Sequence, residues 1–137
     1  MIHVLHICSD YSQQKLYMEL ILELSKRGIK QTVYVPVRSE MEVGNYNVSG
    51  LPNISVIYAH ILKVKHRVFY HLKIKSILAN LQSTIDLSTV DLVHAHFLFS
   101  DGGVAFQINR EYGIPYVVAV RNTDVNVFFK YMVHLRL

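Results

Sequence analysis

The sequence predicts an α/β fold: a doubly wound parallel sheet of about five strands in the order 3-2-1-4-5, with helices on both faces. Short apolar runs bounded by turn residues are typical of buried strands, and they recur along the chain. Longer segments with apolar residues at helical spacing separate these runs, and most of the runs end in polar residues. The length of 137 residues suits a single Rossmann-like domain over residues 1–137.

The first half of the chain contains three predicted strands and two predicted helices. Residues 2–8 form an apolar run, and the turn 9–12 leads into a helix with apolar side chains over 16–24. Gly28 is expected to end this helix, because glycine readily adopts the left-handed conformation at a helix C-terminus. The next predicted elements are a strand over 31–37, a loop over 38–52, a strand over 54–59 and a helix over 68–85.

Residues 91–124 predict a strand, a helix and a second strand in close succession. The apolar segment 91–97 is too short for a stable helix, and Gly113 ends the helical segment that follows it. A second apolar run over 116–120 then ends in polar residues. Such a βαβ unit has parallel strands and a right-handed crossover.

The candidate ligand-binding residues follow the strands at their carboxyl ends, where ligands bind in sheets of this kind. They are Asp10 after the first strand; His96, Ser100, Asp101, Gly102 and Gly103 after the fourth; and Arg121, Asn122 and Thr123 after the fifth. We expect His96, Ser100 and Arg121 to lie within one cleft.

The segment 100–103 supports two interpretations. Ser100 or Asp101 can cap the helix that begins there. Alternatively, Gly102 and Gly103 let an anion or a sugar approach backbone N–H groups at the helix N-terminus. Both interpretations stay open on the sequence alone.

Arg121 and Asp124 are the charged residues after the last predicted strand. A permanent charge at a strand end requires solvent, a carboxylate or a phosphate, because burying it unpaired is costly. Three roles fit Asp124: the partner of Arg121, a helix cap, or a general base. The helix cap is the simplest of the three roles, and the general-base role makes Asp124 the candidate catalytic residue.

The sequence does not predict a cofactor or a metal in this domain. It contains neither the G-x-G-x-x-G pattern nor the G-x-x-x-x-G-K-[ST] pattern. His94 and His96 lie two residues apart on one strand and share a face, with Asp101 close behind. Because this spacing fixes no third ligand, we expect His94 to be a core residue and His96 a cleft residue.

The composition indicates a globular cytoplasmic protein. With 51% hydrophobic and 18% charged residues, the chain is not a disordered tail. A single cysteine excludes a disulfide framework and fits a reducing compartment. No apolar run approaches the length needed to span a bilayer, and no basic segment precedes the first apolar run, so we expect neither a membrane span nor a signal peptide.

A basic stretch lies between residues 43 and 85, which include no acidic residue. Its charges have two interpretations: a solvated helix face, or a surface that binds anionic lipid at the inner face of a membrane. Nucleic-acid binding is not expected, because no recognisable module surrounds the stretch. The candidate membrane-facing residues are Lys63, Lys65, Arg67, Lys73 and Lys75.

Several patterns occur together in one order. They are IHVLHICSDYS at the start, SKRGI before QTVYVPV, D-x-x-H-A-H over 91–96 with a following DGG, and GIPYVVAV before RNTD. Together they resemble the N-terminal half of a family 4 glycosyltransferase. Enzymes of this family have the GT-B fold, in which two Rossmann-like domains face each other across a cleft.

The resemblance implies that this half binds mainly the acceptor of a retaining, hexosyltransferase-type enzyme. The acceptor would be a glycan or a lipid-linked saccharide in polysaccharide or glycolipid assembly. The nucleotide-sugar co-substrate would be held mainly by the C-terminal domain, through an E-x(7)-E pair that this sequence lacks. We therefore expect the chain to be truncated before that domain and not to turn over alone.

The sequence departs from the family pattern at two places. The first turn, residues 9–14, has no glycine pair, and Arg121 stands where many relatives have the histidine of a His-Gly-x-Asp pattern, so only Asp124 matches. Two other interpretations stay open, a stand-alone flavodoxin- or receiver-like binding domain and a non-catalytic remnant. Against a receiver, His60 stands where the third strand ends.

Residues 125–137 are apolar and could begin a helix after Thr123 or Asp124. A surface this apolar is unusual on a monomer. We expect it to mediate self-association, or to be covered by the missing domain.

Overall fold

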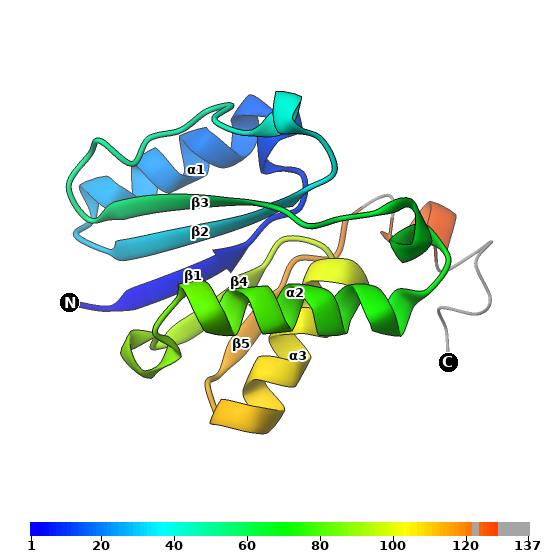
Figure 1. Cartoon of the computed structure of the whole chain (residues 1–137). Helices are drawn as coiled ribbons and strands as arrows, with labels where there is room; N and C mark the ends of the chain where they lie inside the picture. The colour runs from blue at the N-terminus through cyan, green and yellow to red at the C-terminus, as the bar shows by residue number, and fades with distance from the viewer. Residues whose placement is uncertain (122–123, 129–137) are drawn as a thin grey trace.

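Five parallel strands form one sheet in the order β3-β2-β1-β4-β5 in the computed structural model, which describes residues 1–121 and 124–128 (Figure 1). This order confirms the sequence prediction. Each buried strand is joined to the next by a helix or a loop that crosses over the sheet, so neighbouring strands run in the same direction. The strands are β1 (His3–Ile7), β2 (Lys30–Val37), β3 (Ile54–His60), β4 (Leu92–Ala95) and β5 (Tyr116–Val118).

Helices cover both faces of the sheet. Helix α1 (Lys15–Lys26) lies on one face, and α2 (Tyr70–Thr84) and α3 (Ser100–Tyr112) lie on the other (Figure 1). Gly113 ends α3 with φ 71° and donates its N–H to the carbonyl of Asn109, as the sequence predicts. The short helical turns are η1 (Tyr11–Gln13), η2 (Glu40–Glu42), η3 (Val64–Arg67), η4 (Leu87–Thr89) and η5 (Asp124–Phe128).

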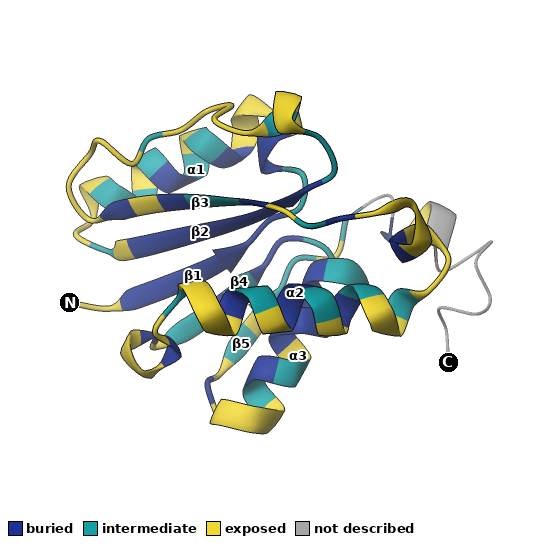
Figure 2. Cartoon of the chain, in the orientation of Figure 1, coloured by how far each residue is buried: buried dark blue, intermediate teal, exposed yellow. Residues whose placement is uncertain are grey.

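The sheet separates two buried clusters (Figure 2). Successive residues of a strand point to opposite faces. On β1, Leu5 and Ile7 therefore pack toward α2 and α3, whereas Cys8 packs with the α1 cluster. His6 and His94 are register partners on β1 and β4, so the same alternation brings their rings together.

Two boundaries differ from the sequence prediction. β5 ends at Val118 instead of residue 120, and β4 ends at Ala95, which leaves His96 just beyond the strand.

The predicted loop over 38–52 contains η2 and is hydrogen-bonded to the first turn. Ser12 Oγ donates to the carbonyl of Glu42 at 2.8 Å, and the Tyr11 hydroxyl donates to the carbonyl of Tyr46 at 2.8 Å.

The predicted self-association segment, 125–137, lies outside the described residues from 129 onward. Val117, Val120 and Val125 nearby are about half exposed. No helix within residues 1–121 and 124–128 is long and apolar enough to cross a membrane.

Candidate functional site

The polar segments that follow β1, β4 and β5 contact one another at the carboxyl edge of the sheet. Ser9, after β1, donates from its backbone nitrogen and its hydroxyl to Asp101 Oδ2, at 3.2 and 3.3 Å. Leu98, after β4, donates its N–H to Asp124 Oδ2 at 3.0 Å. The three strand ends therefore form one connected site, as the parallel topology predicts.

Asp101 lies in the first turn of α3 and is completely buried. Its contact with Ser9 corrects the capping interpretation: neither Ser100 nor Asp101 caps α3, whose N-cap residue is Phe99 without a side-chain cap. Burial raises the pKa of Asp101 to about 7, against the opposing hydrogen bonds from Ser9 and the charge of Lys73. The carboxyl group is thus poised between its neutral and charged forms near neutral pH.

Three buried side-chain atoms at this edge have no hydrogen-bond partner among the described residues. They are His96 Nδ1, Ser100 Oγ and Asp101 Oδ1. Buried polar atoms are nearly always paired, so these three atoms, within six positions of one segment, are the candidate contacts for a ligand or a water molecule. All three belong to residues that the sequence predicts as substrate-binding.

Arg121 lies beside the same segment. Its Nε donates to the backbone carbonyl of His96 at 3.2 Å, and its guanidinium lies 5.7 Å from the Tyr17 ring centroid. Asp124 is buried, and its Oδ2 accepts the backbone N–H of Arg121 at 2.9 Å. Asp124 therefore holds the backbone of Arg121 instead of pairing with its charge or capping a helix, and its catalytic role stays a prediction.

The two glycines of α3 serve close packing. A Cβ on Gly103 would lie 3.0 Å from Ile74 Cδ1 and would collide with the Tyr70 hydroxyl, and one on Gly102 would lie 3.2 Å from the carbonyl oxygen of Phe97. Their N–H groups donate to Phe99 and Phe97 respectively. Both glycine N–H groups are therefore already hydrogen-bonded, so neither is free to bind an anion as the sequence predicted.

The other predicted site residues lie at different distances from this centre. Asp10 is half-buried and accepts a hydrogen bond from Gln14 at 3.2 Å; burial raises its pKa. Asn122 and Thr123 lie outside the described residues. The predicted cleft thus gathers His96, Ser100, Asp101 and Arg121 at one edge.

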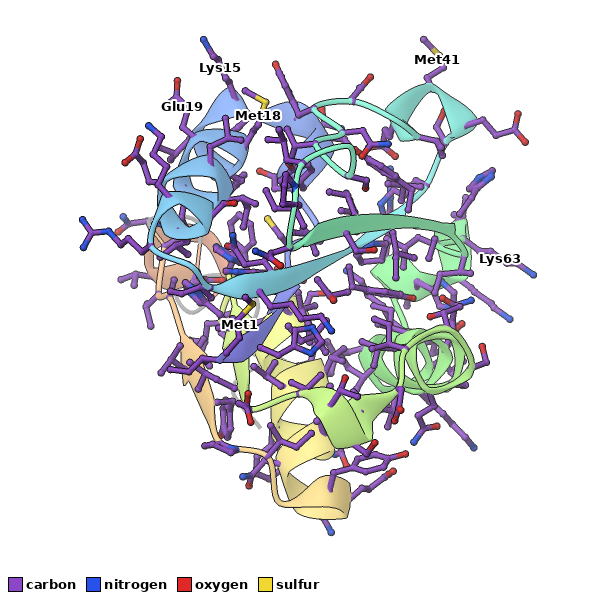
Figure 3. The ribbon with its side chains drawn as sticks, turned by 90° about the vertical axis from the view of Figure 1, so that its left-hand side faces the viewer. Met1, Lys15, Met18, Glu19, Met41 and Lys63 are labelled. Atoms are coloured by element: carbon purple, nitrogen blue, oxygen red, sulfur yellow. The ribbon has the colours of Figure 1, made fainter. Side chains whose placement is uncertain are left out.

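The basic stretch divides into two parts. Lys63, Lys65, Arg67 and Lys75 are exposed, and Lys63 points away from the fold (Figure 3). Lys73 differs from the other four residues of the predicted membrane-facing set, because it is half-buried. That burial lowers its pKa, with a further lowering by Arg38 and an opposing contribution from Asp101. The charges of Lys73 and Asp101 thus influence each other.

Three histidines form a cluster between the sheet and α1. His6 Nδ1 lies 3.0 Å from His96 Nε2, and the ring of His94 stacks on that of His96 with centroids 4.1 Å apart. One nitrogen of each ring lies within 4.8 Å of the others, which is near enough for a transition metal after the rings move. His6 Nδ1 and His96 Nε2 already share a hydrogen bond, so the described arrangement is a hydrogen-bonded one.

Sequence reasoning missed His6 and Gln31. His6 Nε2 lies 3.1 Å from Gln31 Oε1, and both side chains are fully buried. The sequence does show a polar residue in each of two apolar strand runs, His6 in 2–8 and Gln31 in 31–37. Which partner each would meet depends on strand register, which the sequence pattern alone does not supply.

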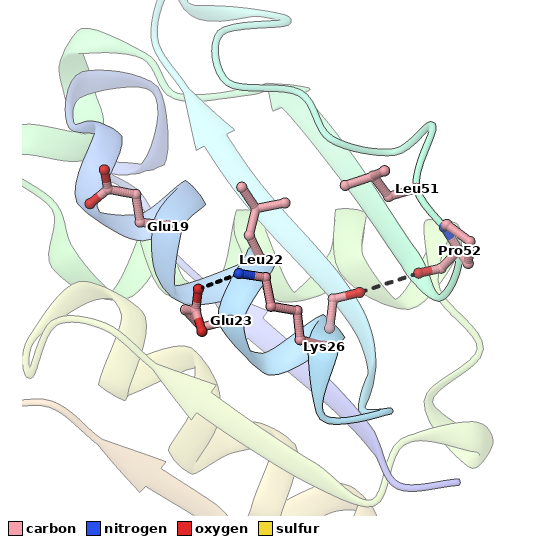
Figure 4. A pocket seen from close by; sticks show the side chains of 7 residues that line it. Glu19, Leu22, Glu23, Lys26, Leu51 and Pro52 are labelled. Atoms are coloured by element: carbon pink, nitrogen blue, oxygen red, sulfur yellow. Dashed lines mark hydrogen bonds and ion pairs between the residues drawn. The ribbon is translucent and has the colours of Figure 1, made fainter.

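A pocket of about 370 Å³ lies far from this edge, between the end of α1 and the segment before β3 (Figure 4). Leu22, Leu51 and Pro52 give it an apolar lining, and Ser25 Oγ reaches the carbonyl of Pro52 at 3.5 Å. It contains none of the predicted site residues.

No protein-family model matches the sequence. A stretch of 41 residues is 44% identical to the putative teichuronic acid biosynthesis glycosyltransferase TuaC of Bacillus subtilis (strain 168), covering 30% of this chain and 10% of that protein. Among solved structures, apo UGT2 of Phytolacca americana is similar with a TM-score of 0.60 and 16% identity, over 94% of this chain and 31% of UGT2.

These comparisons confirm the resemblance to a glycosyltransferase of the GT-B fold. The sequence match is with a glycosyltransferase, and the sheet and its helices have the arrangement found in UGT2. The chain spans about a third of the length of the solved relative. The chain therefore has a Rossmann-like α/β architecture and, over a short stretch of sequence, is similar to a glycosyltransferase.

Proposed function

We propose that this chain binds the acceptor in a glycosyltransferase that moves a hexose from a nucleotide-sugar to a glycan or a lipid-linked saccharide. The observation that carries the proposal is the group of unpartnered buried atoms of His96, Ser100 and Asp101. A hydroxyl-rich ligand supplies hydrogen bonds to such atoms, and leaving them unpaired is costly. The similarity to TuaC, whose name refers to teichuronic acid biosynthesis, supports a role in polysaccharide assembly.

The donor would be bound mainly by a second domain. No E-x(7)-E pair occurs in this sequence, and the described residues hold no glycine-rich phosphate loop. The chain alone should therefore not turn over, and no cofactor is needed beyond the nucleotide-sugar. Asp124 would act at the reacting centre only if it exchanges its contacts with Leu98 and Arg121 for one with the acceptor.

A lipid-linked acceptor would be met at the inner face of the cytoplasmic membrane. Exposed basic residues of η3 and α2 are interspersed with exposed apolar ones in this part of the chain. Cationic residues attract anionic lipid, and apolar residues among them can enter the interface. The exposed apolar residues are Val64, Val68, Phe69 and Leu72.

The acceptor site can be mapped by NMR shift perturbation on the labelled chain, with a panel of neutral and uronic-acid disaccharides as probes. We expect shifts at His96, Ser100 and Asp101 with at least one saccharide. Ser100→Ala and Asp101→Asn should abolish them. Ser83→Ala, an exposed serine on α2, is the matched control. Shifts confined to the pocket of Figure 4, or none with any saccharide, would contradict the proposal.

A further inference from the structure

A chain of buried hydrogen bonds leads from α1 to His96. Gln31 Nε2 donates to the backbone carbonyl of Ile21 at 2.8 Å, which directs the amide oxygen, Oε1, toward His6 Nε2 at 3.1 Å. Reversing the amide would place an oxygen against the carbonyl oxygen of Ile21 and would lose this hydrogen bond. The backbone of α1 therefore decides which end of the amide faces His6.

The direction of the Gln31 amide sets the proton on His6. An amide oxygen only accepts, so His6 Nε2 must carry the hydrogen. Burial lowers the pKa of His6 to about 3, so the ring is neutral and its Nδ1 carries a lone pair. His6 is thus an Nε2–H tautomer whose second nitrogen must accept a hydrogen bond.

The donor to that nitrogen is His96. Its Nε2 lies 3.0 Å from His6 Nδ1 and must carry the hydrogen between them. Burial and the neighbouring His94, His6 and Arg121 lower the pKa of His96 to about 2, so this ring is neutral too. Its Nδ1 therefore carries a bare lone pair, which is buried and has no partner among the described residues.

We propose that Gln31 and His6 are positioning residues that fix His96 as the Nε2–H tautomer, so that its bare Nδ1 atom accepts a hydrogen bond from a hydroxyl group of the bound ligand. Only a donor satisfies a buried lone pair, and a hydroxyl is the donor that a saccharide offers. The assignment of that hydroxyl rests on the proposed function, whereas the relay from Ile21 to His96 stands without it. His94 stacks on the His96 ring and packs one of its faces.

The tautomers can be read directly by long-range ¹⁵N–¹H NMR of the histidine rings in the ligand-free chain at neutral pH. We expect His6 and His96 each to show a protonated Nε2 and an unprotonated Nδ1. Gln31→Glu should reverse the relay: a buried carboxylate favours a doubly protonated His6, whose Nδ1–H then donates to His96 Nε2 and moves the His96 proton to Nδ1. Thr32→Val on the same strand is the matched control, since the Thr32 hydroxyl lies 2.8 Å from Nε2 of His3, which is outside the relay.

The outcomes separate the relay from the ligand. A protonated Nδ1 on His96 in the unsubstituted chain would overturn the proposal, even if Gln31→Glu fails to fold. Zn²⁺ binding at micromolar concentration that shifts the signals of all three rings would also overturn it. A metal would need the lone pair of His6 Nδ1, which in the proposal accepts the hydrogen of His96 Nε2. A disaccharide that moves the Nδ1 signal of His96 supports the hydroxyl contact. The expected tautomers without any such shift would refute the ligand assignment and leave the relay intact.

Discussion

Asp101 Oδ2 accepts two hydrogen bonds from Ser9, at 3.2 and 3.3 Å, while Oδ1 of the same buried carboxyl group has no partner among the described residues. One oxygen thus joins the segments that follow β1 and β4, and the other is free to accept a hydrogen bond from the proposed ligand. Asp101 therefore has a structural role in the fold and a proposed role in binding. Its ionisation should therefore affect stability as well as ligand affinity.

The stability of the chain should depend on pH through Asp101. Its pKa is raised from 3.8 to about 7 in the folded chain, so the folded state binds the proton more tightly than the unfolded state. The stabilisation is fully present below about pH 4 and is lost as pH rises through about 7, with a slope of up to about 1.4 kcal/mol per pH unit. Asp101→Asn should flatten this slope in denaturant titrations made between these limits. Equal slopes in both proteins would contradict the pKa assignment.

Gly103→Ala should destabilise the fold. The new methyl group would meet Ile74 and the Tyr70 hydroxyl, which itself donates to the carbonyl of Phe99. Overpacking of this kind costs about 1–3 kcal/mol. Urea denaturation should show this loss, and Gly50→Ala, where nothing lies within 4 Å of the added carbon, should show little change. Equal urea midpoints for the two variants would contradict this prediction and show that α2 moves to accommodate the methyl group without a loss of stability.

The βαβ order and the shared face of His94 and His96 followed from local pattern alone. Apolar run length, turn residues and strand alternation are all encoded within a few neighbouring positions. The roles of His6 and Lys73 did not follow. His6 meets His96 because β1 pairs with β4, which brings together residues 90 positions apart. Lys73 is influenced by Asp101, which lies 28 positions away on another helix. Contacts between such distant positions leave no local signal.

The exposed basic residues should bind anionic membranes. Lys63→Glu with Lys65→Glu should weaken binding to phosphatidylglycerol vesicles at low salt, because each lysine near the surface contributes about 1 kcal/mol. The same charge change at Lys15 and Lys26, which pair with acidic residues on α1, is the control and should have little effect. Vesicle cosedimentation that is indifferent to salt and to both pairs would refute a lipid-binding role.

The segment 125–137 should make the chain self-associate. Sedimentation velocity should show a mass that increases with concentration, because a segment with so many apolar residues is normally covered. Phe128→Ser with Phe129→Ser should restore a monomer, whereas Phe106→Ser, an exposed aromatic on α3, should not. A constant monomer mass over a wide concentration range would contradict this prediction.

Arg121 should recognise a phosphate on the acceptor. Its guanidinium is held by the His96 carbonyl and the Tyr17 ring, so it is positioned before a ligand arrives. Among the described residues no carboxylate forms an ion pair with it, which leaves its charge to a ligand or solvent. A hydrogen bond between charged partners is worth about 1.5–3 kcal/mol, which corresponds to roughly a tenfold or greater change in affinity.

Farnesyl phosphate and farnesol in detergent solution would test this role without a membrane surface. Arg121→Ala should weaken binding of the phosphate by roughly tenfold or more and leave any binding of the alcohol unchanged. Arg110→Ala is the matched control, because Arg110 lies over the Phe106 ring and both residues are exposed on α3. Detergent removes the contribution of the basic surface, so reversal of Lys63 and Lys65 should have no effect in this assay. If Arg121→Ala binds the phosphate as well as the unsubstituted chain does, the arginine serves only to join the β4 and β5 ends through His96.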